Sequence, residues 1–232
     1  APISLSKNLA GLAECFGKSK ALQARCNLIF LTNAVFVTES VNPEEARAIA
    51  QLNQVIDRYH LHGKIRWLGL RLPNHDLGEV YRTIGDRSGI FVHFALFEAF
   101  GRTILEAMIS GLPTFATQFG GALEIIQDGQ NGFCINPTDL EGTAQKILHF
   151  LDRCDTQPQF WHDISDQAMQ RIHEQYNWQK HTQRLLQLTK IYSFWNYTDG
   201  RRREALDKYL EALFYLLYKP RADLILAEHM KR

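Results

Sequence analysis

The segment spanning residues 95–126 carries two glutamates, Glu98 and Glu106, with seven residues between them. On one straight α-helix these carboxylates would lie about 12 Å apart along the axis and about 80° apart around it, too far to share one bond-breaking event. Gly101 instead predicts that the helix begins near Arg102 and leaves Glu98 in the turn before it. The spacing alone leaves another interpretation open, in which Glu98 is a first-turn acid and Glu106 a solvent-facing helix residue.

A strand-to-helix turn of this kind has a defined place in an α/β fold. In an open parallel sheet, such turns lie at the carboxyl edge of the strands, where ligands bind. The backbone N–H groups of residues 101–103 would then point at a ligand, with the positive end of the helix dipole behind them. One carboxylate in the turn and one on the helix flank could hold the two ends of an elongated polyol. A glycine pair, Gly120 and Gly121, opens a second helical pattern downstream.

Short apolar runs alternate with amphipathic helical patterns over residues 1–138. The runs are mostly apolar on both faces and bounded by Gly, Pro or Asn, which is typical of buried parallel strands. This alternation predicts βαβ units and an α/β domain with a Rossmann-like, doubly wound parallel sheet over residues 1–138. Strands are expected at 26–32, 64–70, 89–95, 112–117 and 132–137, and helices at 42–60, 77–86 and 101–111.

Four helical patterns follow one another over residues 139–232. The last of them is rich in leucine and aromatic residues between Tyr209 and Tyr218. An all-helical tail after an α/β domain must cover some apolar surface. We expect it to pack on the sheet, on a missing N-terminal half of the protein or on a partner subunit.

The composition narrows the class of partner. The chain of 232 residues is 45% hydrophobic with a formal net charge of +1, which predicts neither nucleic acid nor a membrane surface as a partner. No apolar run reaches the length of about 18 residues that a transmembrane helix needs. The four cysteines are far apart, which argues against a zinc site and predicts reduced thiols in a cytoplasmic protein. A Rossmann oxidoreductase is disfavoured because no GxGxxG motif follows a strand.

The run FEAFGRTILEAMISGLPTFAT, followed by FGGALEII, resembles the donor-binding segment of family-4 retaining glycosyltransferases, which have the two-domain GT-B fold. In that family the pattern is Glu, seven residues, Glu, then Gly-x-Pro and a Gly-Gly turn. The stretches GEVYR, QRLLQLT, FWNY and YLEALFYLLYKPRA narrow the resemblance to sucrose synthases, over residues 8–222. The chain therefore looks like the C-terminal, donor-binding portion of a bacterial-type member.

This resemblance implies an activity and roles for particular residues. Sucrose synthases reversibly convert sucrose and a nucleoside diphosphate, ADP or UDP, into nucleotide-glucose and fructose with retention of configuration. No metal or other cofactor is implied. Glu98 is expected to contact the transferred glucose, Glu106 to hold the ribose hydroxyls, and a phosphate-binding lysine to be Lys7 of SKNLAGL. The residues expected to line the sugar and phosphate positions are Phe100, Gly101, Arg102 and Thr103.

Several positions depart from the family pattern. Pro2 and Ser4 stand where an arginine and an aspartate are expected, and Thr32-Asn33 replaces a Gly-Asp pair. In the base-contacting loop, Arg71 and Leu77 stand where plant members have Gln and Asn. Loss of an amide partner for the uracil edge favours ADP over UDP. Arg102 replaces a leucine beside the sugar, and it or Arg71 could supply the positive charge that Pro2 lacks.

The resemblance also implies an N-terminal acceptor half with a catalytic histidine, without which this portion is expected to be inactive. His60, His62 and His93 are interpreted as structural or surface residues. The family is typically a homotetramer, and the Tyr209–Tyr218 segment is a candidate subunit interface or interdomain surface. The alternative function is a degenerate, non-catalytic glycosyltransferase-like domain that acts through subunit association.

Overall fold

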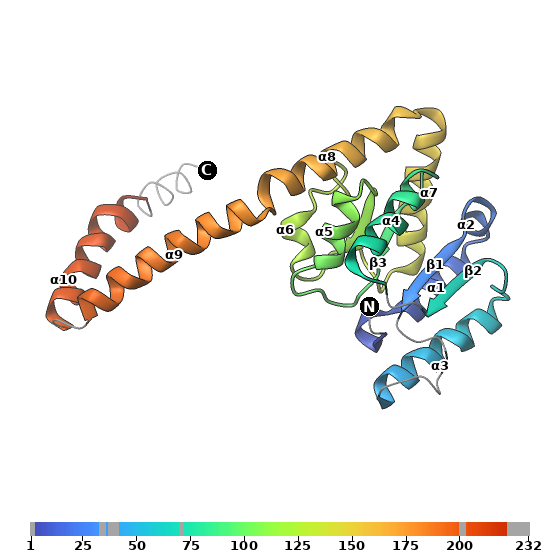
Figure 1. Cartoon of the computed structure of the whole chain (residues 1–232), viewed down its shortest axis with the longest axis horizontal. Helices are drawn as coiled ribbons and strands as arrows, with labels where there is room; N and C mark the ends of the chain where they lie inside the picture. Colours follow the sequence, from blue (N-terminus) through green and yellow to red (C-terminus); the bar gives the residue numbers. More distant parts are fainter. Residues whose placement is uncertain (1–2, 33–35, 37–41, 70–71, 200–202, 222–232) are drawn as a thin grey trace, which may run out of the picture. The chain divides into compact units, whose positions relative to one another are not determined.

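The structure is a computed structural model that describes residues 3–32, 36, 42–69, 72–199 and 203–221. The chain divides into two compact units, Ala1–Tyr176 and Asn177–Arg232 (Figure 1). The boundary expected from the sequence lay earlier, between residues 138 and 139. The two helices that lie between these positions pack into the core of the first unit, because both carry large apolar side chains that the core buries.

Among the residues that the structure describes, the first unit contains five strands, each within one of the segments expected to be a strand, and the strands of each sheet are parallel. Their hydrogen bonds form two sheets, with the orders β1-β2 and β3-β4-β5. The register pairs Phe30 with Trp67 in the first sheet and Phe115 with Phe133 in the second. The strands are β1 (Leu28–Thr32), β2 (Ile65–Gly69), β3 (Phe91–His93), β4 (Thr114–Thr117) and β5 (Phe133–Ile135).

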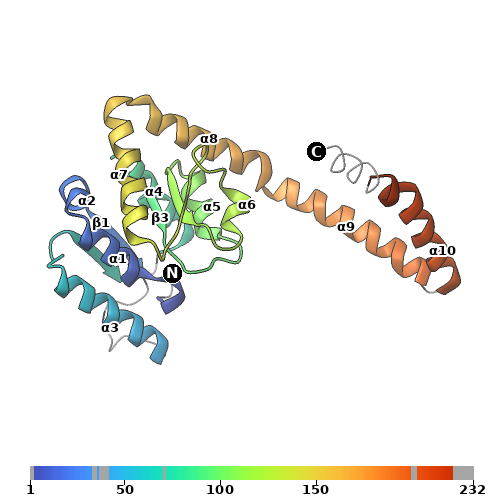
Figure 2. The ribbon, with the colours of Figure 1, turned by 180° about the vertical axis from the view of Figure 1, so that it is seen from behind.

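Eight α-helices connect and cover these strands within the described part of the first unit. The three helices expected between the strands are present, and α3 begins as its sequence predicts, with the Asn42 side chain accepting a hydrogen bond from the Glu45 amide at 2.8 Å. Helix α1 packs against both α3 and α7 (Figure 2). The helices are α1 (Leu9–Lys18), α2 (Lys20–Arg25), α3 (Pro43–Arg58), α4 (Asn74–Gly85), α5 (Arg102–Ile109), α6 (Ala122–Ile125), α7 (Leu140–Thr156) and α8 (Gln159–Gln175).

One hydrophobic core joins the two sheets. It contains Phe30 of β1 together with Phe115 and Phe133, whose rings stack with centroids 4.6 Å apart. All four residues of β4 are buried, as expected for a strand that is covered on both faces. Helices α7 and α8 add Phe150 and Trp161 to the same core. Burying each such side chain contributes about 1.5–3 kcal/mol, so these helices help to hold the two sheets together.

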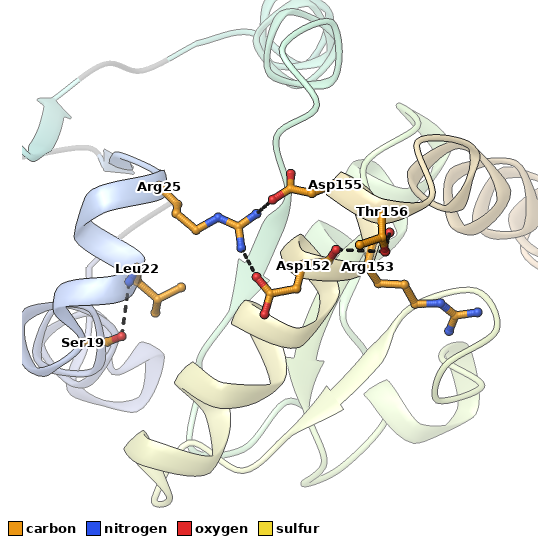
Figure 3. A network of polar contacts seen from close by, with 7 residues as sticks. All are labelled: Ser19, Leu22, Arg25, Asp152, Arg153, Asp155 and Thr156. Carbon is orange, nitrogen blue, oxygen red and sulfur yellow. Dashed lines mark hydrogen bonds and ion pairs between the residues drawn. The ribbon is translucent and has the colours of Figure 1, made fainter.

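A polar contact between α2 and α7 complements this core. Figure 3 shows Arg25 of α2 reaching Asp152 and Asp155 of α7, with one guanidinium nitrogen on each carboxylate. Ser19 caps α2 by accepting a hydrogen bond from the Leu22 amide at 3.3 Å. The Arg25–Asp152 contact joins residues 127 positions apart and so ties α2 to the end of α7.

The second unit is helical, as the sequence predicts. It comprises α9 (Trp178–Asp199), α10 (Arg203–Leu213) and a π-helical turn at Phe214–Tyr218. Within it, the rings of Phe194 and Tyr209 meet edge to face with centroids 5.4 Å apart. Many of its large apolar side chains are exposed. Among the residues described, no helix is long and apolar enough to cross a membrane.

Candidate functional site

The turn between β3 and α5 places Glu98 at the start of a helix, as its sequence predicts. Strand β3 ends at His93, and α5 begins at Arg102 with Gly101 as its N-cap at φ 96°. The Oε1 atom of Glu98 accepts hydrogen bonds from the Gly101 amide at 3.2 Å and from the Phe100 amide at 3.4 Å. The carboxylate therefore lies at the positive end of the α5 dipole, where a negative charge is stabilised.

The glycine pair allows the backbone of this turn to lie against a second loop. The Glu98 amide donates to the Phe119 carbonyl at 3.0 Å, and the Gly121 amide donates to the Glu98 carbonyl at 2.7 Å. A Cβ atom at Gly120 would lie 2.1 Å from the Glu98 carbonyl oxygen. One at Gly121 would lie 2.4 Å from the Ala99 carbonyl oxygen. Only glycine permits so close an approach of the two backbones.

Lys7 reaches the same carboxylate from the start of the chain. Its Nζ atom lies 2.8 Å from Glu98 Oε2, so the two predicted catalytic residues, 91 positions apart, are in direct contact. The Leu96 amide donates to the Ser6 carbonyl at 2.9 Å and fixes the two segments side by side. Asn8, with φ 52°, turns the chain from the 3-10 turn Leu5–Lys7 into α1. Asparagine tolerates this left-handed conformation better than most residues, which accounts for the asparagine that follows Lys7.

His93 is a third member of this cluster, which the sequence did not indicate. Its side chain is 6% exposed, and its Nε2 atom lies 2.9 Å from Glu98 Oε2. It is therefore a buried neighbour of the key carboxylate and not a surface residue. The signal that could have found it is a polar side chain at the carboxyl end of an apolar strand, five positions before Glu98.

The surroundings of Glu98 and His93 shift their pKa values. Burial works to raise the pKa of Glu98, but the hydrogen bond and charge of Lys7, with smaller contributions from His93 and the Phe100 amide, lower it below its ordinary value. Burial lowers the pKa of His93, and the charge of Lys7 lowers it further, against the opposing effect of Glu98. Near neutral pH the cluster therefore holds an ionised Glu98 beside a neutral imidazole.

Glu106 stands apart from this cluster, on the exposed flank of α5. Its Oε1 atom lies 3.1 Å from Arg102 Nε, in a pair with side-chain exposures of 29% for Glu106 and 78% for Arg102. Burial, followed by the charge of Glu106, raises the pKa of Tyr81 to about 12. The ion pair between Arg102 and Glu106 lies within one helix, four positions apart. Thr103 is partly buried on the first turn of the same helix.

The structure places the remaining predicted site residues in different surroundings. Leu77 of α4 packs against a small apolar cluster that contains Tyr81 and Ala107. The Phe100 side chain is 57% exposed beside the Glu98 turn, and Phe97 is 63% exposed. Three residues lie outside the described residues, so their expected roles stay predictions: Pro2, Asn33 and Arg71. Within the described ranges, no group of three His, Cys, Asp or Glu side chains could hold a metal ion.

Comparison with protein families gives a match to the model "Glycosyl transferases group 1" over residues 4–163. This match contains the Lys7–Glu98–His93 cluster, α5 and the glycine pair.

Full-length relatives resemble nearly the whole chain. A protein named sucrose synthase from Thermosynechococcus vestitus is 60% identical over 97% of this chain, and one from Melioribacter roseus is 46% identical over the same share. Sucrose synthase 2 of Arabidopsis thaliana is 38% identical over 94% of this chain. The chain spans about 28% of the length of the bacterial relatives and 27% of the plant one.

Solved structures share the fold. Anabaena HepE in complex with UDP superposes with a TM-score of 0.66 at 22% identity, over 82% of this chain and 47% of HepE. Sucrose-phosphate synthase from Thermosynechococcus elongatus superposes with a TM-score of 0.65 at 17% identity, over 81% of this chain and 43% of that protein. These likenesses confirm the Rossmann-like α/β architecture predicted from the sequence.

Proposed function

The chain belongs to the group 1 glycosyltransferase family, and from that premise we propose that it forms the donor-nucleotide domain of a sucrose synthase. The proposed reaction is the reversible, anomer-retaining conversion of sucrose and a nucleoside diphosphate into nucleotide-glucose and fructose. The observation that carries this proposal is the contact between Lys7 and Glu98 at the N-terminal end of α5. The similarity to sucrose synthases supplies the substrate class.

Lys7 is proposed to bind the diphosphate of the donor. Its side chain is 40% exposed, so the ammonium group can leave Glu98 for a ligand without unfolding its surroundings. The amide N–H groups at the start of α5 form the positive end of the helix dipole, beside Lys7. A diphosphate held by these groups is stabilised as its negative charge grows during departure of the sugar.

Glu98 is proposed to hold the glucosyl group. Its ionised carboxylate accepts hydrogen bonds from backbone amides on Oε1, which leaves Oε2 for sugar hydroxyls once Lys7 has turned to the diphosphate. The exposed rings of Phe97 and Phe100 provide apolar surface next to this carboxylate. A mainly apolar surface with a few fixed polar groups is typical of a small-molecule site.

Glu106 is proposed to accept hydrogen bonds from the ribose hydroxyls, with Thr103 on the same helix lining the site. In the free protein Glu106 pairs with Arg102. The ribose therefore replaces an exposed ion pair, which costs little free energy to break. The packing of Leu77 among apolar residues supports the absence of an amide partner for uracil, so we propose that ADP binds more tightly than UDP.

The test is a calorimetric titration of the chain with ADP and with UDP, repeated on Lys7→Ala. Loss of a hydrogen bond between a charged group and the phosphate is expected to weaken binding by about tenfold or more. Lys18→Ala is the matched control. It removes the same charge from the end of α1, where Lys18 is 54% exposed and pairs with Glu14 at 2.9 Å. This control is expected to leave the affinity within about twofold of the wild type.

The outcomes separate the proposed site from general charge attraction. Equal losses of nucleotide affinity in Lys7→Ala and Lys18→Ala would show that Lys7 acts only by long-range charge attraction. Absence of binding by the folded wild-type chain would contradict the donor site itself. The alternative of a non-catalytic domain has no observation in its favour among the described contacts, and the Lys7–Glu98 contact favours the donor site.

Two further parts of the proposal concern the cellular location of the protein and its self-association. A cytoplasmic location is supported by the four cysteines, all of which are free. Self-association, as a tetramer, is supported by the exposed apolar side chains of the second unit, which include Leu186, Tyr192 and Leu216. Light scattering on the purified chain measures the mass of the assembly.

A further inference from the structure

His93 is buried in a way that needs an explanation. Its side chain is 6% exposed. Neither ring nitrogen has a well-directed hydrogen bond among the described residues, although Nε2 lies 2.9 Å from Glu98 Oε2. Burying a polar ring without hydrogen bonds costs free energy, and leucine or valine would fill this strand position without that cost. A buried polar group of this kind points to a role at the adjoining site.

The surroundings of His93 indicate what that role is. Two titratable groups face the ring, Lys7 from the start of the chain and Glu98 from the turn after β3. In the free protein Lys7 contacts the same Oε2 atom that His93 approaches. If Lys7 moves to a donor diphosphate, that oxygen loses its cation. The described side chain left beside Oε2 is then His93, and a small rotation of its ring aims the Nε2 proton at the carboxylate.

We infer that His93 is a positioning residue. When the donor binds and Lys7 moves to its diphosphate, His93 replaces Lys7 as the hydrogen-bond donor to Glu98. This inference rests on the proposed function, because it assumes that Lys7 leaves Glu98 for a diphosphate. The neutral imidazole donates its Nε2 proton to Oε2 and holds the carboxylate toward the glucosyl group. Because the ring is neutral near pH 7, it orients Glu98 without adding a second cation beside Lys7.

The distinguishing measurement is the gain in affinity that the sugar provides. Wild-type chain, His93→Leu and His93→Gln are titrated calorimetrically with ADP and with ADP-glucose. We expect His93→Leu to bind ADP within about twofold of the wild type but ADP-glucose about tenfold more weakly, because Glu98 loses a hydrogen bond to a charged group. His93→Gln keeps a side-chain N–H donor near the position of Nε2, and is expected to recover most of the binding of ADP-glucose.

Other results would overturn this role. Equal losses for both ligands in His93→Leu would make His93 a packing residue. An unchanged affinity of His93→Leu for ADP-glucose, or no recovery in His93→Gln when thermal unfolding shows that it is folded, would exclude a positioning role.

A second measurement keeps the inference separate from the proposed function. The titration of His93 is followed by NMR in the wild type, in Glu98→Gln and in Lys7→Ala. Removing the Glu98 charge is expected to lower the pKa of His93, and removing the Lys7 charge to raise it. If the wild-type chain binds no nucleotide, the proposed function fails while these shifts still report the His93–Glu98 contact. If neither variant shifts the pKa of His93, the inference itself fails.

Discussion

The turn that holds Glu98 and the helix flank that holds Glu106 place the same type of side chain in two different environments. Glu98 is 15% exposed and touches Lys7, from the start of the chain, and His93, at the end of β3. Glu106 is 29% exposed and pairs with Arg102, one turn away on the same helix. The first carboxylate is positioned by the tertiary structure, and the second by the helix alone.

This difference determines how much each region should tolerate change. The Glu98 turn depends on backbone contacts with no room for adjustment and on a carboxylate that is largely removed from water. Contacts of that kind carry large energies when one partner is lost. The Glu106 flank depends on an exposed pair at helical spacing, which is worth about 0.3–0.5 kcal/mol. Substitutions should therefore have effects that fall steeply from the turn to the flank.

The largest effect is expected for Gly120→Ala. The new Cβ atom would lie 2.1 Å from the Glu98 carbonyl oxygen, at a residue with φ 101°. Left-handed strain of about 1–2 kcal/mol and displacement of the turn together should reduce the free energy of unfolding by about 4 kcal/mol. Urea denaturation measures this loss. Gly129→Ala is the control, because Gly129 has φ 77° but nothing within 4 Å of a new Cβ atom.

The control isolates the clash from the backbone strain. Gly129→Ala should lose only the strain, about 1–2 kcal/mol. If the two variants lost the same free energy, the approach of residue 120 to the Glu98 turn would not constrain the fold.

Lowering the pH is expected to have an intermediate effect on the free energy of unfolding. The pKa of His93 is lowered from its ordinary value of 6.5, so as the pH falls below 6.5 the unfolded chain takes up this proton first. The pKa of Glu98 is lowered from 4.5, which adds a second loss of stability below pH 4.5. The free energy of unfolding should therefore decrease as the pH falls below 6.5, and a further decrease should begin below 4.5.

His93→Gln tests the first of these losses, because glutamine does not titrate. The variant should show a flatter dependence of unfolding free energy on pH between 6.5 and 5 than the wild type, measured by urea denaturation. An unchanged slope would mean that His93 titrates alike in the folded and unfolded states.

The smallest effect is expected for Arg102→Ala on the flank. Loss of the pair with Glu106 should cost about 0.3–0.5 kcal/mol of stability in dilute buffer and less at high salt. Thermal unfolding at two salt concentrations measures it, with Lys18→Ala as the reference for another exposed pair at the same helical spacing. A loss several times larger would show that the flank is as constrained as the turn.

Much of the architecture could be predicted from local patterns. Helix and strand periodicity located the five strands and the helices that connect them, because these periods reflect which face of each element is buried. Gly101 indicated the start of α5 and so placed Glu98 in the turn. The similarity of residues 95–126 to a known family pattern identified both glutamates as candidates, and the stretch SKNLAGL identified Lys7, before their positions were known.

Only the tertiary structure brought Lys7, His93 and Glu98 together. Lys7 and Glu98 are 91 positions apart, and no local period relates them. His93 looked like one polar interruption of an apolar strand until its ring was found beside the carboxylate. Side-chain patterns within a few residues report which face of an element is buried. Contacts between distant segments depend instead on how those elements pack, which is decided by the whole core at once.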